Sequence, residues 1–256
     1  MKIIVLVKQV PDTYGERKLD TVTGLLNRSV GDRVIDEINE RALETALSYK
    51  DSHNDAEVIV LSMGPATATE ALRKALSMGA DAAVHVVDDA LVGSDLGLTS
   101  RVLAAAVART GYDLLVAGNE STDGRGGVIP SMIAERLAIP HLSSMATIEI
   151  SESSVSGERR TEAAAATVHA ALPAIVSVTE SAPEARFPNF KGIMTAKRKP
   201  LTTLSVSELD VDLTSGGRSV VTITTERPVR SAGTKIIDDG NAAVELAEFL
   251  AAGRLI

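Results

Sequence analysis

The residues best suited to binding chemistry lie in one stretch, residues 112–137, which reads YDLLVAGNESTDGRGGVIPSMIAERL. An apolar run at 114–117 gives way at Gly118 to small and polar residues, and a helical pattern follows Pro130. Glycines let a backbone approach a phosphate closely, and the N–H groups at a helix N-terminus attract anions. The loop has neither the GK[ST] ending of a Walker loop nor a GxGxxG turn. Its spacing therefore leaves two interpretations open: nucleotide binding, or an ordinary glycine-rich connection between a strand and a helix.

The charged residues near this loop give little sign of catalysis. Asp123 is a lone carboxylate, and we expect it to brace the loop or to form a turn. Lys8 follows an apolar run and could touch a phosphate, although a lysine at a strand end is more often solvated. No Ser/His/Asp set and no pair of carboxylates stands out, which argues against an enzyme such as an ATP-using ligase or hydrolase.

The composition narrows the classes of protein. Among 256 residues, 45% are hydrophobic and only 2% aromatic, so we expect a sizeable core of Ala, Val, Leu and Ile. The net charge of -8 argues against nucleic acid or an anionic membrane as partner. There is no cysteine, and the four histidines, at 53, 85, 141 and 169, lack metal-ligand spacing. The start, MKIIVLV, is too short for a secretory signal, and no run reaches the length of a membrane span, so we expect a cytoplasmic protein without membrane insertion.

Predicted strands and helices alternate over the first half of the chain. Strands are predicted at 3–7, 57–63, 82–87 and 114–117, and helices at 36–49, 67–78, 95–109 and after Pro130. Asp36 is expected to cap the first helix, and Gly79 to end the second. This order predicts an α/β fold, a parallel sheet with helices on both faces, whose ligands bind beyond the carboxyl ends of the strands. The stretches expected to meet there are 8–12, 63–65 and 118–130.

The character of the chain changes after Pro140. We expect a strand meander, with strands at 145–150, 159–168 and 174–178 and a turn at 151–157. Residues 181–201 hold three prolines and two of the three phenylalanines, so 184–194 should be a protruding loop and not a regular helix or a central strand. Residues 210–230 are polar and β-branched, and a helix is predicted at 241–252. Such a weakly apolar tail is more typical of an arm than of a second core.

Two motifs together resemble the β subunit of electron transfer flavoprotein. They are VAGNESTDGRGGVIPSMIAERL and, more specifically, VSVTESAPEARFPNFKGIMTAKRKP. The segments MKIIVLVKQVPDT, LSMGPATATEALRKALSMGAD and PVRSAGTKI are also similar, so the resemblance covers almost the whole chain.

The resemblance implies one subunit of a heterodimer that carries electrons and has no catalytic residues of its own. It implies a Rossmann-like domain of the adenine-nucleotide-binding type over 1–200, with a partner-recognition loop at 181–200. It also implies a C-terminal arm, 201–256, packing on the α subunit. AMP would be structural, and the redox FAD would sit mostly on the α subunit. Electrons would come from acyl-CoA and other flavin dehydrogenases, as in fatty acid β-oxidation, and pass to a membrane-associated quinone oxidoreductase or another acceptor.

The family's AMP contacts fall on residues of four stretches of this chain. They are Leu6, Asp36, Glu37, Ile38, Asn39, Met63, Glu120, Ser121, Thr122, Asp123, Gly124, Arg125, Gly126, Gly127, Val128, Ile129, Pro130 and Ser131. Electron-bifurcating relatives hold a second FAD instead and have a loop resembling DGDTAQVGP, whereas this loop reads DGRGGVIP, so AMP is favoured. Where many members have Asn-Pro-Phe near the first helix, this chain has Asp36-Glu37-Ile38.

The family's partner contacts fall on Arg186, Phe187, Phe190, Ile193 and Met194, with Phe190 as the apolar anchor. From composition alone, the alternative is that both rings tuck into the body of the protein. Two other functions also stay open on the residues themselves. One is a homodimeric nucleotide-binding protein of the universal-stress type, which would leave 181–200 and the arm without a role. The other is the ATP-using enzyme already considered.

Overall fold

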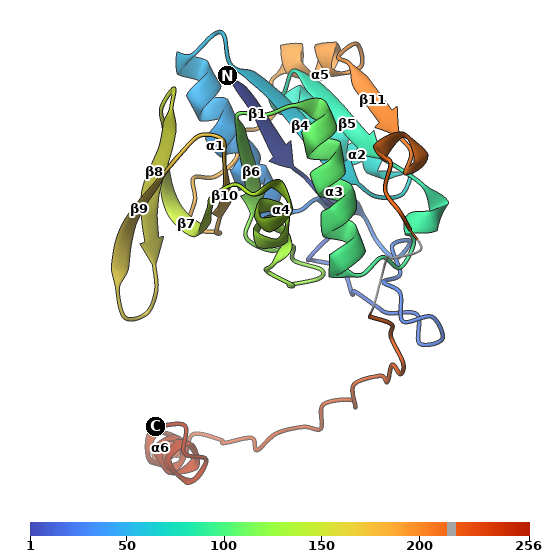
Figure 1. The fold of residues 1–256 in the computed structure, drawn as a ribbon. Helices are drawn as coiled ribbons and strands as arrows, with labels where there is room; N and C mark the ends of the chain where they lie inside the picture. Colours follow the sequence, from blue (N-terminus) through green and yellow to red (C-terminus); the bar gives the residue numbers. More distant parts are fainter. Residues whose placement is uncertain (214–218) are drawn as a thin grey trace. The chain divides into compact units, whose positions relative to one another are not determined.

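The computed structural model describes residues 1–213 and 219–256. The described chain divides into two units, Met1–Ile223 and Thr224–Ile256. The first unit contains one nine-stranded sheet in the order β11-β5-β4-β1-β6-β10-β7-β8-β9 (Figure 1). Its strands are β1 (Lys2–Leu6), β4 (Glu57–Met63), β5 (Ala82–Val86), β6 (Leu114–Gly118), β7 (His141–Ile150), β8 (Ser154–Arg160), β9 (Ala165–Ala171), β10 (Ala174–Val178) and β11 (Leu201–Leu204). Two short strands, β2 (Gln9–Pro11) and β3 (Arg33–Ile35), form a separate antiparallel pair.

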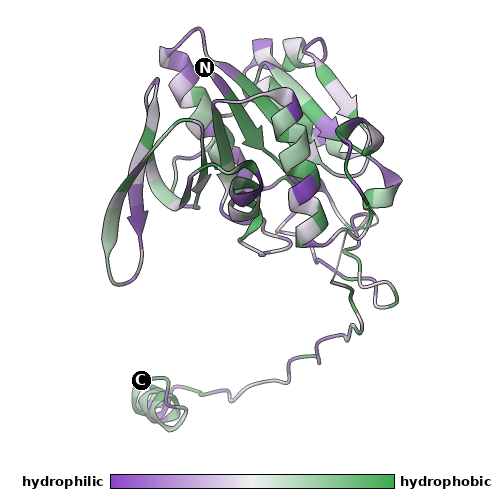
Figure 2. Cartoon of the chain, in the orientation of Figure 1, coloured by the Kyte–Doolittle hydropathy of each residue, from purple (hydrophilic) through white to green (hydrophobic). Residues whose placement is uncertain are grey.

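Helices cover both faces of this sheet, as the sequence predicts (Figure 1). They are α1 (Glu37–Ser52), α2 (Ala68–Met78), α3 (Leu96–Thr110), α4 (Ile129–Leu137) and α5 (Phe190–Ala196), with short 3₁₀ turns η1 (Asp89–Leu91) and η2 (Ser207–Leu209). Alternate residues of β1 enter different cores: Ile3 and Val5 pack with α1 and α2, and Ile4 with α3 and α4. In Figure 2 the central strands are green, whereas the helices that cover them carry both green and purple residues. Apolar side chains on both faces of a parallel strand explain the near-continuous apolar runs of the sequence.

The predicted caps are confirmed. The Asp36 side chain accepts a hydrogen bond from the Ile38 N–H and begins α1, and Gly79, at φ 145°, ends α2. Within residues 13–33, Leu19 and Leu26 form an isolated antiparallel bridge. No helix in the described residues is long and apolar enough to cross a membrane.

The prediction for the meander is wrong in two respects. Strand β10 does not belong to the antiparallel meander. This strand lies between β6 and β7 in the sheet and pairs in parallel with both. The turn expected at 151–157 and the strand at 159–168 are displaced, because β8 starts at Ser154 and β9 at Ala165. The turn is closed by hydrogen bonds between Ser151 and Ser154. Gly157 is a pairing position, where an added Cβ would lie 2.0 Å from the Thr147 carbonyl oxygen.

The segment expected to be irregular contains a helix. Residues 184–189 lack regular structure, but α5 runs over Phe190–Ala196. The Asn189 side chain accepts a hydrogen bond from the Gly192 N–H at 2.7 Å and so caps α5. Gly192 permits close packing on α2, since a Cβ there would lie 2.2 Å from the Ser77 carbonyl oxygen. The prolines that argued against a helix lie before and after α5, where they break no helical hydrogen bond.

The second unit consists of extended chain and α6 (Ala242–Ala252), close to the predicted helix at 241–252. No residue of α6 is buried. Strand β11 pairs with β5, so the first four residues of the expected C-terminal arm belong to the main sheet. Part of the polar stretch expected at 210–230, residues 214–218, lies outside the described residues.

Candidate functional site

A cavity of about 600 Å³ lies beyond the carboxyl ends of β1, β4, β5 and β6. This volume is within the range of small-molecule sites. The three stretches expected to meet at this edge all contribute to it, through Lys8, through 63–65 and through much of 118–130. The predicted site residues that line it are Leu6, Asn39, Met63, Glu120, Ser121, Gly124, Gly126, Gly127, Ile129 and Pro130.

The remaining predicted contacts do not line this cavity. They are Asp36, Glu37, Ile38, Thr122, Asp123, Arg125, Val128 and Ser131. Asp36 is fully buried, and one of its carboxylate oxygens accepts hydrogen bonds from the Thr122 N–H at 2.6 Å and the Thr122 hydroxyl at 2.7 Å. Asp36 therefore ties the start of α1 to the glycine-rich loop.

Asp123 braces the loop, as expected for a lone carboxylate. Its side chain is 2% exposed, and it forms ion pairs with Lys8 at 2.7 Å and Arg28 at 3.7 Å. Burial raises the pKa of Asp123, but Lys8, the Ser121 hydroxyl and Arg28 together outweigh burial and hold the pKa below its ordinary value. Lys8 also donates to the Ser121 hydroxyl at 3.1 Å, so its ammonium group is paired within the chain although its side chain is 38% exposed.

Two arginines that the sequence analysis did not single out connect residues 13–33 to the site. Arg17 donates to the Thr122 hydroxyl at 2.9 Å and to the Pro11 carbonyl at 3.1 Å. Arg28 lines the cavity and pairs with Asp123. The only sequence signal was a polar segment with four basic residues, Arg17, Lys18, Arg28 and Arg33, that follows a strand.

The loop backbone offers donors for an anion. No described residue accepts a hydrogen bond from the N–H groups of residues 126–129, which lead into α4. Gly127 has φ 63°, and a Cβ built there would meet only a Glu120 carboxylate oxygen, at 4.0 Å. The buried Asn119 side-chain oxygen, at the edge of the same cavity, has no partner among the described residues. Unpaired donors at a helix N-terminus, beside cationic side chains, suit a phosphate group.

A hydrogen-bonded chain supports the first turn of α4. His141 contacts the Ser131 hydroxyl through Nδ1 and the Ser177 hydroxyl through Nε2, both at 3.0 Å. The Ser177 oxygen also accepts the Ser144 N–H, at 3.0 Å. Burial, and then the charge of Arg159, lower the pKa of His141 to about 4, so the ring is neutral at pH 7. His141 therefore links Ser131 of α4 to Ser177 of β10, and the described residues hold no group of side chains that could bind a metal.

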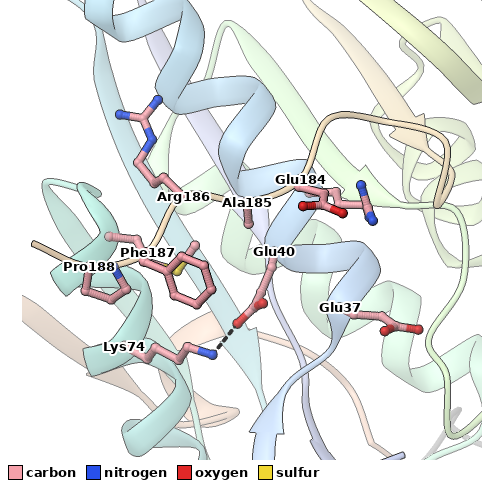
Figure 3. Close-up of a pocket in the computed structure, with 10 residues that line it drawn as sticks. Glu37, Glu40, Lys74, Glu184, Ala185, Arg186, Phe187 and Pro188 are labelled. Carbon is pink, nitrogen blue, oxygen red and sulfur yellow. Dashed lines mark hydrogen bonds and ion pairs between the residues drawn. The ribbon is translucent and has the colours of Figure 1, made fainter.

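The predicted partner contacts lie on α5 and the chain just before it. Phe187 is 93% exposed and Phe190 81%, and Ile193 and Met194 are exposed as well, so the rings do not tuck into the body. A second cavity, of about 210 Å³, lies where this segment passes α1 and α2 (Figure 3). Glu37 lines this second cavity, although the resemblance implied a nucleotide contact. Arg186 differs from its neighbours because its guanidinium is bonded to Glu44 and Asp51.

Comparison with known proteins gives a consistent result. Residues 23–209 match the family model described as electron transfer flavoprotein domain. The chain is 46% identical over 263 residues to the electron transfer flavoprotein subunit beta of Mycobacterium leprae, covering 99% of each chain. It is 32% identical over 271 residues to the subunit of the same name from Megasphaera elsdenii, covering 100% of each. It is also 36% identical over 203 residues to the caffeyl-CoA reductase-Etf complex subunit CarD of Acetobacterium woodii, covering 79% of this chain and 77% of that one.

Proposed function

The chain belongs to the electron transfer flavoprotein family as a β subunit, and on that premise we propose that it holds AMP as a structural nucleotide within a heterodimer. Membership in this family argues against both alternatives, a homodimeric nucleotide-binding protein of the universal-stress type and an ATP-using enzyme. The observation that carries the proposal is the set of unpaired N–H groups at residues 126–129 beside the 600 Å³ cavity. The nucleotide's phosphate would lie at these donors, close to Lys8 and Arg28.

FAD bound mainly by the α subunit would supply the redox chemistry, because an adenine nucleotide has none that is accessible. The residues of this chain would bind and orient. The loop donors hold the phosphate, while Asp36 and Asp123 hold the loop. The exposed, largely apolar surface of α6 would pack on the α subunit.

Nucleotide extraction tests this proposal. The chain should be purified together with its α subunit and denatured, and the released nucleotides separated and counted. We expect one AMP and one FAD per heterodimer, and the β chain alone should be colourless. Two FAD and no AMP would contradict the proposal and point to the bifurcating type.

A substitution in the loop tests the phosphate position. Gly127→Val puts a branched side chain on a positive-φ residue facing the cavity, so we expect AMP content to fall at least fivefold. Gly111→Val is the matched control: it has φ 75°, ends α3 and has nothing within 4 Å of its Cβ. Equal AMP loss in both variants would show a general effect of backbone strain and not a phosphate site.

The exposed segment around α5 is the proposed docking site for acyl-CoA and other flavin dehydrogenases, with a quinone oxidoreductase as one electron acceptor. Phe190→Ala should cut electron transfer from an acyl-CoA dehydrogenase roughly thirtyfold at low concentration. An aromatic side chain that enters a pocket of the partner contributes about 2 kcal/mol or more to the binding free energy. An 81% exposed ring adds little to the fold, so the melting temperature and flavin spectrum should stay near wild type. Unchanged transfer would remove Phe190 as the anchor.

A further inference from the structure

We propose that Arg186 is a positioning residue: clamped by Glu44 and Asp51 of α1, it sets the backbone that presents Phe187 and Phe190 to a partner. This inference rests on the proposed docking function. It assigns Arg186 a different role from the direct partner contact that the sequence resemblance implies.

The clamp uses the whole donor fork of the arginine. The Arg186 side chain donates to the two carboxylate oxygens of Glu44, from Nε at 2.7 Å and from Nη2 at 2.8 Å. Its Nη1 and Nη2 reach Asp51 at 3.2 and 2.8 Å. With each nitrogen of the guanidinium already bonded within the chain, little donor capacity remains for a partner.

The backbone is held as well as the side chain. The N–H of Arg186 donates to Glu44 at 3.0 Å, which fixes the main chain directly before Phe187. Figure 3 shows the Arg186 guanidinium extending away from the Phe187 ring, so the clamp and the exposed ring lie on different sides of the segment. Fixing one side of an extended segment therefore determines which way the other side chain points.

Glu44 is well placed to carry this clamp. It is 8% exposed, in the middle of α1, and also accepts from the Ser48 hydroxyl at 3.0 Å. Burial raises the pKa of Glu44, but the hydrogen bonds from Arg186 outweigh it, and the pKa lies below its ordinary value. The carboxylate is thus charged when the segment is in place.

The C-terminal end of the exposed segment, just after α5, is attached to the body by other hydrogen bonds. Arg73 of α2 donates to the carbonyls of Ala196 and Lys199 at 2.8 and 2.9 Å, and Asn189 caps α5. Between these two attachments, the apolar side chains stay exposed on a fixed backbone. A preorganised segment loses less conformational freedom on binding than a mobile one.

The test compares Arg186→Lys and Glu44→Gln in the heterodimer with an acyl-CoA dehydrogenase as the electron donor. Lysine keeps the charge but loses the fork, and glutamine keeps the shape of Glu44 but loses its charge. We expect the KM for the flavoprotein to rise about tenfold in each, with kcat and FAD content unchanged. Amide hydrogen exchange at 184–189 should become faster. Lys74→Gln is the control, because Lys74 lines the same cavity but pairs with Glu40 instead.

Glu44→Gln separates the clamp from a direct contact. If Arg186 bound the partner itself, releasing it from Glu44 would leave the KM unchanged or lower it, and this result would overturn the proposal. A rise in KM without faster exchange at 184–189 would also overturn it. If Phe190→Ala leaves transfer unchanged, the docking function itself fails. If Phe190→Ala slows transfer and the two clamp variants do not, only the clamp fails.

Discussion

At the scale of single residues, buried charges in this protein hold segments together. Asp36 joins α1 to the glycine-rich loop, and Asp123 joins the loop to Lys8 and Arg28. Removing one partner of a buried pair leaves the other charge uncompensated, which usually costs more than the pair contributes. These carboxylates were expected to touch the nucleotide or to brace its loop, and their bonds within the chain make bracing their role in the described structure.

His141 gives a prediction about pH. The unfolded chain takes up a proton near pH 6.5, whereas the folded ring does so only near pH 4. As the pH falls from 6.5 to 4, the unfolded state therefore binds more protons and stability is lost, by at most about 1.4 kcal/mol per pH unit. The free energy of unfolding of His141→Gln should depend less on pH in this window than that of wild type, by urea denaturation at several pH values.

His169 supplies a control for this measurement, because it lies on β9, away from this chain of serines. His169→Gln controls for replacing a histidine by glutamine outside the hydrogen bonds that join Ser131, His141 and Ser177. Identical profiles for wild type and His141→Gln would show that the ring of His141 is protonated in the folded state as readily as in the unfolded one.

At the scale of elements, α5 depends on what lies beneath it. The helix has only seven residues, too few to be stable by itself. It is held by the Asn189 cap, by close packing of Gly192 on α2, and by Arg73 beyond its end. Helix α5 is therefore a short helix attached to the longer α2. The face of α5 that packs on α2 is covered, and its apolar side chains lie exposed on the other face.

Gly192→Ala should displace α5. The new Cβ would lie 2.2 Å from the Ser77 carbonyl oxygen, which belongs to the backbone of α2 and cannot rotate away. We expect a loss of about 1–3 kcal/mol in the free energy of unfolding, typical of overpacking, and faster amide exchange over 190–196. Lys191→Ala, on the same helix, controls for helix propensity. Wild-type stability and exchange in Gly192→Ala would mean that α5 does not pack as closely as described.

At the scale of the whole molecule, the chain consists of a body with a complete core and a second unit without one. Helix α6 buries no residue, and Val244, Leu246 and Phe249 are exposed on it. A helix this apolar requires a surface to cover it. In a β subunit, the α subunit is the natural candidate.

Deleting residues 224–256 should separate folding from assembly. The melting temperature of the body should change by only a few degrees, because its two cores lie within the first unit. Affinity for the α subunit should fall at least tenfold, measured by co-purification and by calorimetry. Leu246→Asp in the full chain should weaken assembly in the same direction, and Glu248→Ala should not. A truncated chain that assembles normally would assign α6 another role.

Local patterns in the sequence determined much of this protein. The apolar runs and helical periods predicted the alternating strands and helices of the body, the caps at Asp36 and Gly79, and the edge where the loops meet. These features depend on residues a few positions apart, which a pattern contains. The family motifs added the electron-transfer role, which no periodicity could give.

Only the tertiary structure decided which distant residues meet. The apolar run of β10 would suit a meander or a central strand equally well, and its place was decided by the two open edges of β6 and β7. The helix α5 required α2 beneath it. Arg186 and Glu44 lie 142 positions apart in the chain, and Lys8 and Asp123 lie 115 apart. A charged side chain looks the same in a sequence whether it is solvated, bound to a partner or paired internally, because its partner is set by the packing of elements and not by its neighbours in the chain.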